Sequence, residues 1–479
     1  MKHVKAYGNS VIVSIFCTGI LAGIALTKLQ VLIELSWLLI LLPLLVFVIR
    51  RHNIYILGIL LLFGLIIGNF RGNSFSSELA FYDEFNNKKV EMLVTPLNDA
   101  QYNDRKQLEF DAKILRVGNG ESEAPAGKIK VSGFGESAIY KGDQLVVSGK
   151  LFKTRGSRQA SVGFAQIRLV SRGDFVIDNI RRQFASGISS VLPDPQAPFG
   201  LGLLIGQKST LSEEATGWLA AVGLTHIIAV SGYNLTIIVR FITRVFGKRS
   251  RYQTVLFSIV TIGLFLLMTG FSASIVRASI VCGLSLFAWY YGRKIKPMVL
   301  ILLTASITAV WYPSYLWSDI GWYLSFLAFF GVLVLAPLIT KRVFRSTPRP
   351  LTSALIETIC AQIMTVPLIL YIFGEFSTVA LISNMLVVCL IPLAMLLTLV
   401  AGIVGMINPA TLYLLAVPAK ILLSYILFVA YRLSLLPNAL ITQSISVLTM
   451  TVLYAIIALL CVLLWNKTKG GRGIITDVI

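Results

Sequence analysis

Histidine and acidic residues are scarce in this sequence, and both shortages restrict its chemistry. The 479 residues include three histidines, His3, His52 and His226, and only 22 aspartates and glutamates. A metal centre needs several ligands close together, so this spread predicts no metal site and no resident cofactor. The five cysteines all lie in apolar runs, which argues against a disulfide framework. Their spacing also matches no zinc motif.

Charge is also scarce, and one sign dominates. Only 13% of the residues are charged, 56% are hydrophobic, and the net charge is +20. No soluble domain has this balance, so most of the chain is expected in lipid. Residues 71–190 hold 18 basic and 14 acidic residues, so the apolar remainder carries most of the excess. That excess fits positive-inside bias and an anionic partner: membrane lipid, nucleic acid or an anionic solute.

Apolar runs of membrane-spanning length recur along the chain and predict about twelve transmembrane helices. The expected spans are 10–28, 31–49, 54–70, 225–246, 254–270, 272–291, 297–312, 317–339, 352–373, 379–405, 411–436 and 446–465. We interpret the first as an uncleaved span rather than a signal peptide, because no small-x-small cleavage site ends it.

The polar segment between the third and fourth spans has strand-like alternation. Five runs separated by turn residues predict strands: VEMLVTPL, QLEFDAKILRV, GKIKVSGF, DQLVVSGKLF and SVGFAQIRLV. Five short strands in about a hundred residues suit a small barrel such as an OB-fold. The fold class is therefore a polytopic α-helical membrane protein with an inserted all-β, OB-like domain.

The predicted organisation has five parts. They are N-terminal transmembrane helices at 1–72, the β domain at 73–173, amphipathic interfacial helices at 174–224, the main membrane domain at 225–465 and a tail at 466–479. Ser212 before two glutamates is expected to cap a helix in the interfacial part. Every strong basic cluster falls on one side if both termini are cytoplasmic, which places 73–224 outside.

Several motifs resemble, in order, those of the ComEC family. GLLIGQKSTLSEE (202–214) and GLTHIIAVSGYNLTIIV (223–239) resemble its signature, and the β domain with YKGDQLVVSGKL (140–151) resembles its extracellular OB-like domain. Three later stretches resemble further spans of the family: SASIVRASIVCGL (272–284), IGWYLSFLAFFGVLVLAPLI (320–339) and AQIMTVPLILYIFGEFSTVALISNMLVVCLIPLAM (361–395). The resemblance covers about 70–479.

The resemblance implies an inner-membrane channel that passes single-stranded DNA into the cytoplasm during natural transformation. It also implies partners: an outer DNA receptor, a separate nuclease and a cytoplasmic helicase-like ATPase. Many relatives carry a metallo-β-lactamase-like domain, which needs histidine ligands that this chain lacks, so no enzyme activity is expected.

Polar side chains inside spans are expensive and are expected to face water, substrate or another helix. The expected channel-lining residues are His226, Ser231, Gly232, Asn234, Arg277, Gln362 and Asn384. The alternatives are interhelical hydrogen bonds for the neutral residues and a structural ion pair with Glu357 for Arg277.

Basic and aromatic residues on the predicted strands are candidates for DNA contact, because cations bind phosphates and aromatic faces stack bases. They are Arg116, Lys128, Lys130, Phe152, Lys153, Arg155 and Arg158. The aromatic residues could equally be core.

Two rival functions remain. A transporter for a small anion or lipid precursor would need no nucleic-acid-binding barrel. An intramembrane serine hydrolase could use Ser231 and His226, but these lie on one segment, whereas such enzymes pair the two on different spans.

Overall fold

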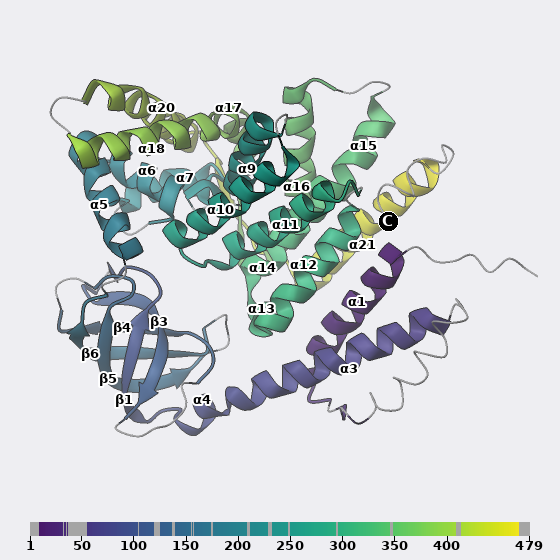
Figure 1. Cartoon of the computed structure of the whole chain (residues 1–479), viewed down its shortest axis with the longest axis horizontal. Helices are drawn as coiled ribbons and strands as arrows, with labels where there is room; N and C mark the ends of the chain where they lie inside the picture. Colours follow the sequence, from purple (N-terminus) through teal and green to yellow (C-terminus); the bar gives the residue numbers. More distant parts are fainter. Residues whose placement is uncertain are drawn as a thin grey trace, which may run out of the picture. The chain divides into compact units, whose positions relative to one another are not determined.

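The computed structural model forms two compact units (Figure 1). Unit 1 comprises residues 1–179 with 302–322, and unit 2 comprises 180–301 with 323–479. The residues described are 9–31, 33–34, 36, 55–103, 105–118, 125–136, 139–154, 156, 158–173, 176–207, 211–228, 232–247, 250–293, 296–344, 348–408 and 413–468.

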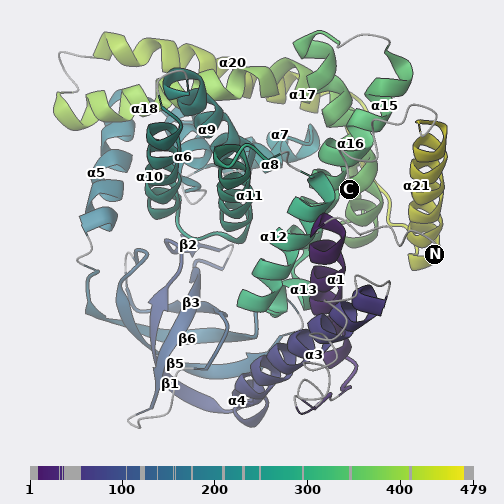
Figure 2. The same ribbon diagram turned by 45° about the vertical axis from the view of Figure 1, so that its right-hand side comes forward.

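A pair of apolar helices in unit 1 packs through glycine. The helices are α1 (Asn9–Thr27) and α3 (Tyr55–Glu78), side by side in Figure 2. A Cβ at Gly23 would lie 2.1 Å from the carbonyl oxygen of Leu65, and one at Gly68 would lie 2.1 Å from that of Ile20. Small residues spaced four apart let helix backbones approach this closely in lipid, where packing replaces the hydrophobic effect.

The polar segment of unit 1 folds into a β-barrel after the short helix α4 (Ala80–Glu84). Its strands are β1 (Lys89–Pro96), β2 (Gln101–Tyr102), β3 (Leu108–Val117), β4 (Ile129–Phe134), β5 (Gln144–Lys153) and β6 (Ala160–Ser171). Pairing runs from β1 through β3, β4, β6 and β5 back to β1, and only β4–β6 among these pairs is parallel. The five long strands confirm the five predicted runs, with bounds differing by one or two residues.

Alternating residues of these strands fill the barrel. Met92, Phe110, Ile114 and Leu145 are fully buried with their neighbours in one cluster. Outward positions carry the charged side chains, as the period of two requires. The barrel therefore has its own core.

Gln159 ties the barrel to α13 (Ser314–Ser318) and the turn before it, also in unit 1. Its Nε2 donates to Ser314 Oγ at 3.1 Å, and its Oε1 accepts from Tyr312 OH at 3.0 Å. The same oxygen accepts from the backbone N–H of Lys128 at 2.7 Å. Trp317 Nε1 in turn donates to the carbonyl oxygen of Ile24, near the C-terminal end of α1, at 2.9 Å. The barrel, α13 and one end of α1 thus belong to one bonded assembly.

Unit 2 is helical. Its elements are α5 (Val176–Val191), α6 (Gln196–Ile205), α7 (Glu213–Ala221), α8 (Thr225–Ile228), α9 (Gly232–Phe246), α10 (Arg251–Thr269), α11 (Ala273–Tyr290), α14 (Ile320–Phe330), a π-helical turn (Gly331–Leu335), α15 (Ala336–Val343), α16 (Pro350–Ile372), α17 (Ala380–Val387), α18 (Ile391–Ile407), α20 (Val417–Ser434) and α21 (Val447–Thr468). A small ladder joins β7 (Glu375–Ser377) to β8 (Leu440–Thr442). The helix α12 (Pro297–Trp311) crosses the boundary between the units, as α5 and α14 do at their first residues.

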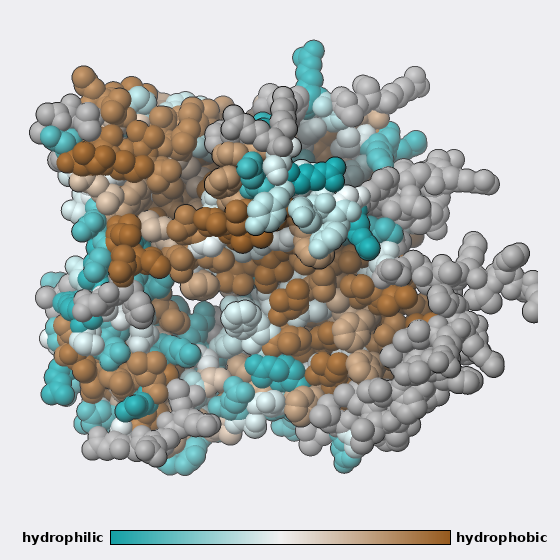
Figure 3. Space-filling model, viewed as in Figure 1, coloured by the Kyte–Doolittle hydropathy of each residue, from teal (hydrophilic) through white to brown (hydrophobic). Residues whose placement is uncertain are grey.

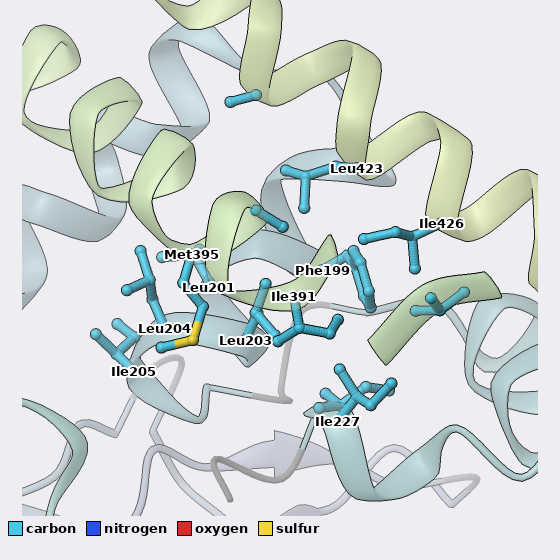
Figure 4. Packing of buried hydrophobic residues seen from close by; sticks show 14 of the residues in the cluster. Phe199, Leu201, Leu203, Leu204, Ile205, Ile227, Ile391, Met395, Leu423 and Ile426 are labelled. Atoms are coloured by element: carbon cyan, nitrogen blue, oxygen red, sulfur yellow. The ribbon is translucent and has the colours of Figure 1, made fainter. Parts of the chain in front are cut away.

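The core of unit 2 is built around α6. Every residue from Ala197 to Ile205 is buried. Figure 4 shows α6 side chains packed among Ile391 and Met395 of α18 and Leu423 and Ile426 of α20. A helix that is apolar on all sides belongs in an interior rather than at a surface. The helix α6 lies within the segment 174–224, which is predicted to hold helices at the membrane surface. For α6 that prediction is wrong, because its apolar residues are covered by other helices of the protein.

The outward faces of the long helices are apolar. Leu393, Leu396 and Ile403 of α18 and Ile421 and Phe428 of α20 are exposed, and the brown surface over these two helices in Figure 3 is continuous. In water such a surface would be unstable, whereas lipid covers it without cost.

Nine helices within the described residues are long and apolar enough to cross a membrane. They match nine of the twelve predicted spans. The span at 31–49 falls largely outside the described residues. The span at 225–246 contains α8 and α9 on either side of residues 229–231, which are outside the described residues, and the span at 297–312 forms α12. The multi-pass helical class with a separate β domain is confirmed, and α12 is a continuous helix that is shorter than those nine.

We expect Gly68→Val to destabilise unit 1, because the new side chain collides with the α1 backbone. Overpacking of this kind costs about 1–3 kcal/mol in the free energy of unfolding. The matched control is Gly58→Val on the same helix, where an added Cβ meets nothing within 4 Å. Thermal unfolding of both variants in detergent measures the difference, and equal midpoints would contradict the glycine-packing account.

Candidate functional site

The segment that carries the polar signature leads from the core helix α6 through α7 and α8 to α9. Ser212 caps α7 as predicted, because its Oγ accepts from the backbone N–H of Ala215 at 3.3 Å. The chain turns at Gly223, whose φ of +73° favours glycine. An added Cβ there would lie 2.8 Å from the Cβ of Ala380, so α17 packs directly on this turn.

Asn234 in the first turn of α9 contacts the end of α6. It is 1% exposed, and its Nδ2 donates to the carbonyl oxygen of Leu203 at 3.5 Å. Leu203 lies in the last turn of α6, where backbone carbonyls have no partner inside the helix. The contact supplies one, at the long end of hydrogen-bond distances.

Gly232 and Arg277 come together at the crossing of α9 and α11. A Cβ at Gly232 would lie 2.7 Å from the Cβ of Ala278, the residue that follows Arg277. Arg277 is 2% exposed. A cation this deep in an apolar helix is costly, and the close crossing places it in the interior of unit 2. Glu357, its predicted alternative partner, lies within electrostatic range of Arg240.

Ser383 of α17 contacts the turn between α7 and α8, and Asn384 follows it on the same helix. Ser383 Oγ donates to the carbonyl oxygen of Val222 at 2.7 Å. Asn384 is 6% exposed, and its Oδ1 has no hydrogen-bond partner within the described part of the chain. A buried unsatisfied acceptor is costly, so this oxygen is a candidate binding group.

The remaining predicted lining residues lie elsewhere. His226 on α8 is exposed, with its Nδ1 3.0 Å from the carbonyl oxygen of Gly223. Gln362 is half-buried on α16. Ser231 lies outside the described residues. The structure thus brings Gly232, Asn234 and Arg277 to neighbouring positions around the start of α9, and it places Gln362 on a separate helix.

On the barrel, two predicted DNA-contacting residues share a row that crosses four strands. Phe152 of β5 pairs with Ser161 of β6, which pairs with Lys130 of β4, which pairs with Asp111 of β3. All four point outward, and Phe152 is 42% exposed. Nearby, the Nζ of Lys150 lies 5.6 Å from the centre of the Phe152 ring. An aromatic face beside cations is the arrangement that binds single strands.

Carboxylates neutralise three of the predicted cations. Lys130 Nζ lies 2.6 Å from Glu109 Oε1, and Arg158 Nε lies 2.6 Å from Asp111 Oδ1. Lys153 pairs with Asp83 of α4. Such exposed pairs contribute little to stability, but they reduce the positive potential that attracts phosphate.

The other predicted cations are dispersed. Arg116 is exposed on a different row, with Leu93 of β1, Val146 of β5 and Arg168 of β6. Lys128 is half-buried next to Gln159, and Arg155 lies outside the described residues. Sequence reasoning missed Arg168, although the outward alternation of β6 marks it.

A family model described as "Competence protein" matches residues 203–468. The chain belongs to the Competence protein family. It is 22% identical over 221 residues to the ComE operon protein 3 of Bacillus subtilis (strain 168), and the match covers 45% of this chain and 28% of that relative. No solved structure matches the chain.

The match confirms the ComEC-type resemblance indicated by the motifs. It begins in α6 and ends with α21, so it contains every predicted lining residue. With its long apolar helices, this Competence family protein is a multi-pass protein of the inner membrane. The barrel lies outside the matched region, so its role depends on its own geometry.

We expect Ser383→Ala to weaken unit 2, because the carbonyl of Val222 loses a buried donor. The expected cost is about 1–3 kcal/mol in the free energy of unfolding. Ser434→Ala is the control, since the hydroxyl of Ser434 donates to a carbonyl of its own helix, that of Tyr431, at 2.8 Å. Unfolding of both variants in detergent tests this, and an equal loss would show that the α17 contact contributes nothing.

Proposed function

We propose that this protein passes a single DNA strand across the cytoplasmic membrane during natural transformation. The observation that carries the proposal is the Competence family match over 203–468, which coincides with the helical core built on α6. The net charge of +20 and the barrel row of Phe152 and Lys130 support an anionic, stackable substrate.

The barrel is an OB-fold in this proposal. Its five long strands close in the order β1–β3–β4–β6–β5, and among them β4 and β6 are parallel. OB-folds are small Greek-key barrels that bind oligonucleotides through one face and its adjoining loops. Arg116, Lys128, Lys130, Phe152, Lys153, Arg155 and Arg158 would contact the DNA, with Phe152 stacking a base and the cations holding phosphates.

The conduit runs through unit 2 and is lined by His226, Ser231, Gly232, Asn234, Arg277, Gln362 and Asn384. His226 and Gln362 are accessible and would meet the strand directly. Asn234, Arg277 and Asn384 are buried, so they would meet it only when the helices packed around them separate locally. Polar groups at these depths are tolerated where they line a wet cavity.

The barrel lies outside the cell and both termini lie in the cytoplasm in this proposal. Tyr312 and Ser314, in a loop predicted to be outside, bond the barrel through Gln159, so both must be on one side. The C-terminal end of α1 bonds Trp317 on that same side, which leaves the start of α1 on the other.

The protein makes and breaks no covalent bonds and uses no cofactor in this proposal. Strand capture, degradation of the second strand and pulling would fall to an outer DNA receptor, a separate nuclease and a cytoplasmic helicase-like ATPase. The alternative of a small-anion or lipid-precursor transporter lacks a use for the Phe152 and Lys130 row.

In a deletion strain, we expect the wild-type gene to restore cytosolic single strands and His226→Leu with Gln362→Leu to abolish them. The leucines remove accessible polar groups from the wall, so DNA should accumulate outside the inner membrane. The controls are Gln253→Leu and Thr451→Leu, which change exposed polar residues on α10 and α21.

Membrane levels of all variants are measured by immunoblot, and imported DNA is measured with labelled transforming DNA. Import by the double variant at the level of its controls would contradict the lining assignment. Unimpaired import in the deletion strain itself would contradict the proposed function.

A further inference from the structure

A polar hollow opens on the outer face of the barrel beside β2 and β3. Its volume is about 240 Å³. It is lined by Asn98, Tyr102, Asn103, Glu109, Asp111 and Arg158, among others. Ligand pockets for drug-sized molecules span roughly 300–1,000 Å³. This hollow is smaller, so it could hold one aromatic ring of a ligand but not several nucleotides or amino-acid residues.

Amide side chains hold the walls of the hollow in place. Asn98 Oδ1 accepts from the backbone N–H of Asp111 at 2.9 Å. Asn103 Oδ1 accepts from the backbone N–H groups of Arg105 and Gln107 at 3.0 and 2.9 Å. Asn98 thereby holds the loop before β2 against β3, and Asn103 holds the turn between β2 and β3, which lowers the cost of ordering the site when a ligand enters.

Two carboxylates line the hollow without giving it a net negative charge. Glu109 is paired with Lys130, and Asp111 is paired with Arg158, each at 2.6 Å through one oxygen. A carboxylate has two oxygens and about four acceptor positions. Acceptor positions on Glu109 and Asp111 therefore remain available, while the paired cations suppress repulsion of a phosphate backbone.

An aromatic face lies at the edge of the hollow. Tyr102 is 63% exposed and pairs with Leu108 of β3. Exposed aromatic rings on such barrels stack bases. A ring seated against Tyr102 would present its edge to the carboxylates of β3.

We propose that this hollow holds one nucleobase of the DNA strand and favours bases with an exocyclic amine over thymine. The inference rests on the proposed function and adds a base preference to it. Carboxylates accept from the N4 amine of cytosine, whereas thymine and uracil present a carbonyl oxygen there. A carbonyl oxygen turned toward the carboxylates of Glu109 and Asp111 would face acceptors where the amine of cytosine would donate, which disfavours thymine and uracil in that orientation.

The test compares the binding of dC12 and dU12 to the full chain in nanodiscs of neutral lipid. The two labelled oligonucleotides have equal charge and no ring methyl group, so their affinity ratio isolates the base edge. We expect dC12 to bind at least about fivefold more tightly, the low end for a good base-edge contact. Glu109→Met and Asp111→Leu should each move that ratio toward one, even if freed cations raise overall affinity.

The matched control is Glu91→Met, which removes an exposed carboxylate of β1 outside the hollow and should leave the ratio unchanged. Equal binding of dC12 and dU12 by the wild type would overturn the base preference and leave DNA transport standing. A preference that survives both substitutions would overturn this location for it. Binding of neither oligonucleotide would count against DNA as the substrate and against the hollow with it.

Discussion

The helical unit depends on one constraint, which is that a helix buried on all sides must find partners for the backbone groups at its ends. The helix α6 is surrounded by α18 and α20, so water does not reach its carbonyls. Gly206 closes its last turn with φ of +73°, and Asn234 reaches the carbonyl of Leu203. The Asn234 contact therefore ties α9 to the end of α6, and α9 crosses α11 closely at Gly232, next to the buried Arg277.

Close contacts between the backbones of neighbouring helices occur at glycine residues in both units. Gly187 of α5 and Gly405 of α18 approach so closely that an added Cβ on Gly405 would collide with the carbonyl oxygen of Gly187. The α1 and α3 pair uses the same device in unit 1. Since lipid tails are as apolar as leucine, such contacts stabilise helix pairs that hydrophobicity cannot. In unit 1, Gln159 of the barrel bonds Tyr312 and Ser314, and Trp317 bonds the end of α1. Motion of α1 is therefore expected to affect the barrel.

Much of the architecture could be predicted because its signals are local. Strand alternation placed all five long strands, and Ser212 marked the start of α7, since both depend on neighbours in sequence. The interior position of α6 was missed, because a short apolar run does not reveal whether protein or interface covers it. The span predicted at 297–312 forms α12 with bounds that differ by one residue, because an apolar run of that length is itself a local signal.

The site was less predictable than the fold. Lys130 and Arg158 were predicted as DNA contacts because they are basic residues near predicted strands. Their carboxylate partners lie 21 and 47 positions away in the sequence and come close to them only when the barrel folds. The hollow beside β2 has the same origin, since Asn98 and Asp111 meet only when the loop folds onto β3. The buried contacts of Asn234 and Ser383 also join distant helices. Long-range pairing of this kind leaves no periodic signal in the sequence.

The measurement that tests the account most directly is the electrical conductance of planar bilayers containing the purified full chain. If the helical unit forms a conduit for a single strand, the bilayers conduct ions, and a single-stranded oligonucleotide added on the side of the barrel interrupts the current. A duplex of the same length should leave the current unchanged. Folded protein that conducts no ions, or a current that single strands do not alter, would contradict the account.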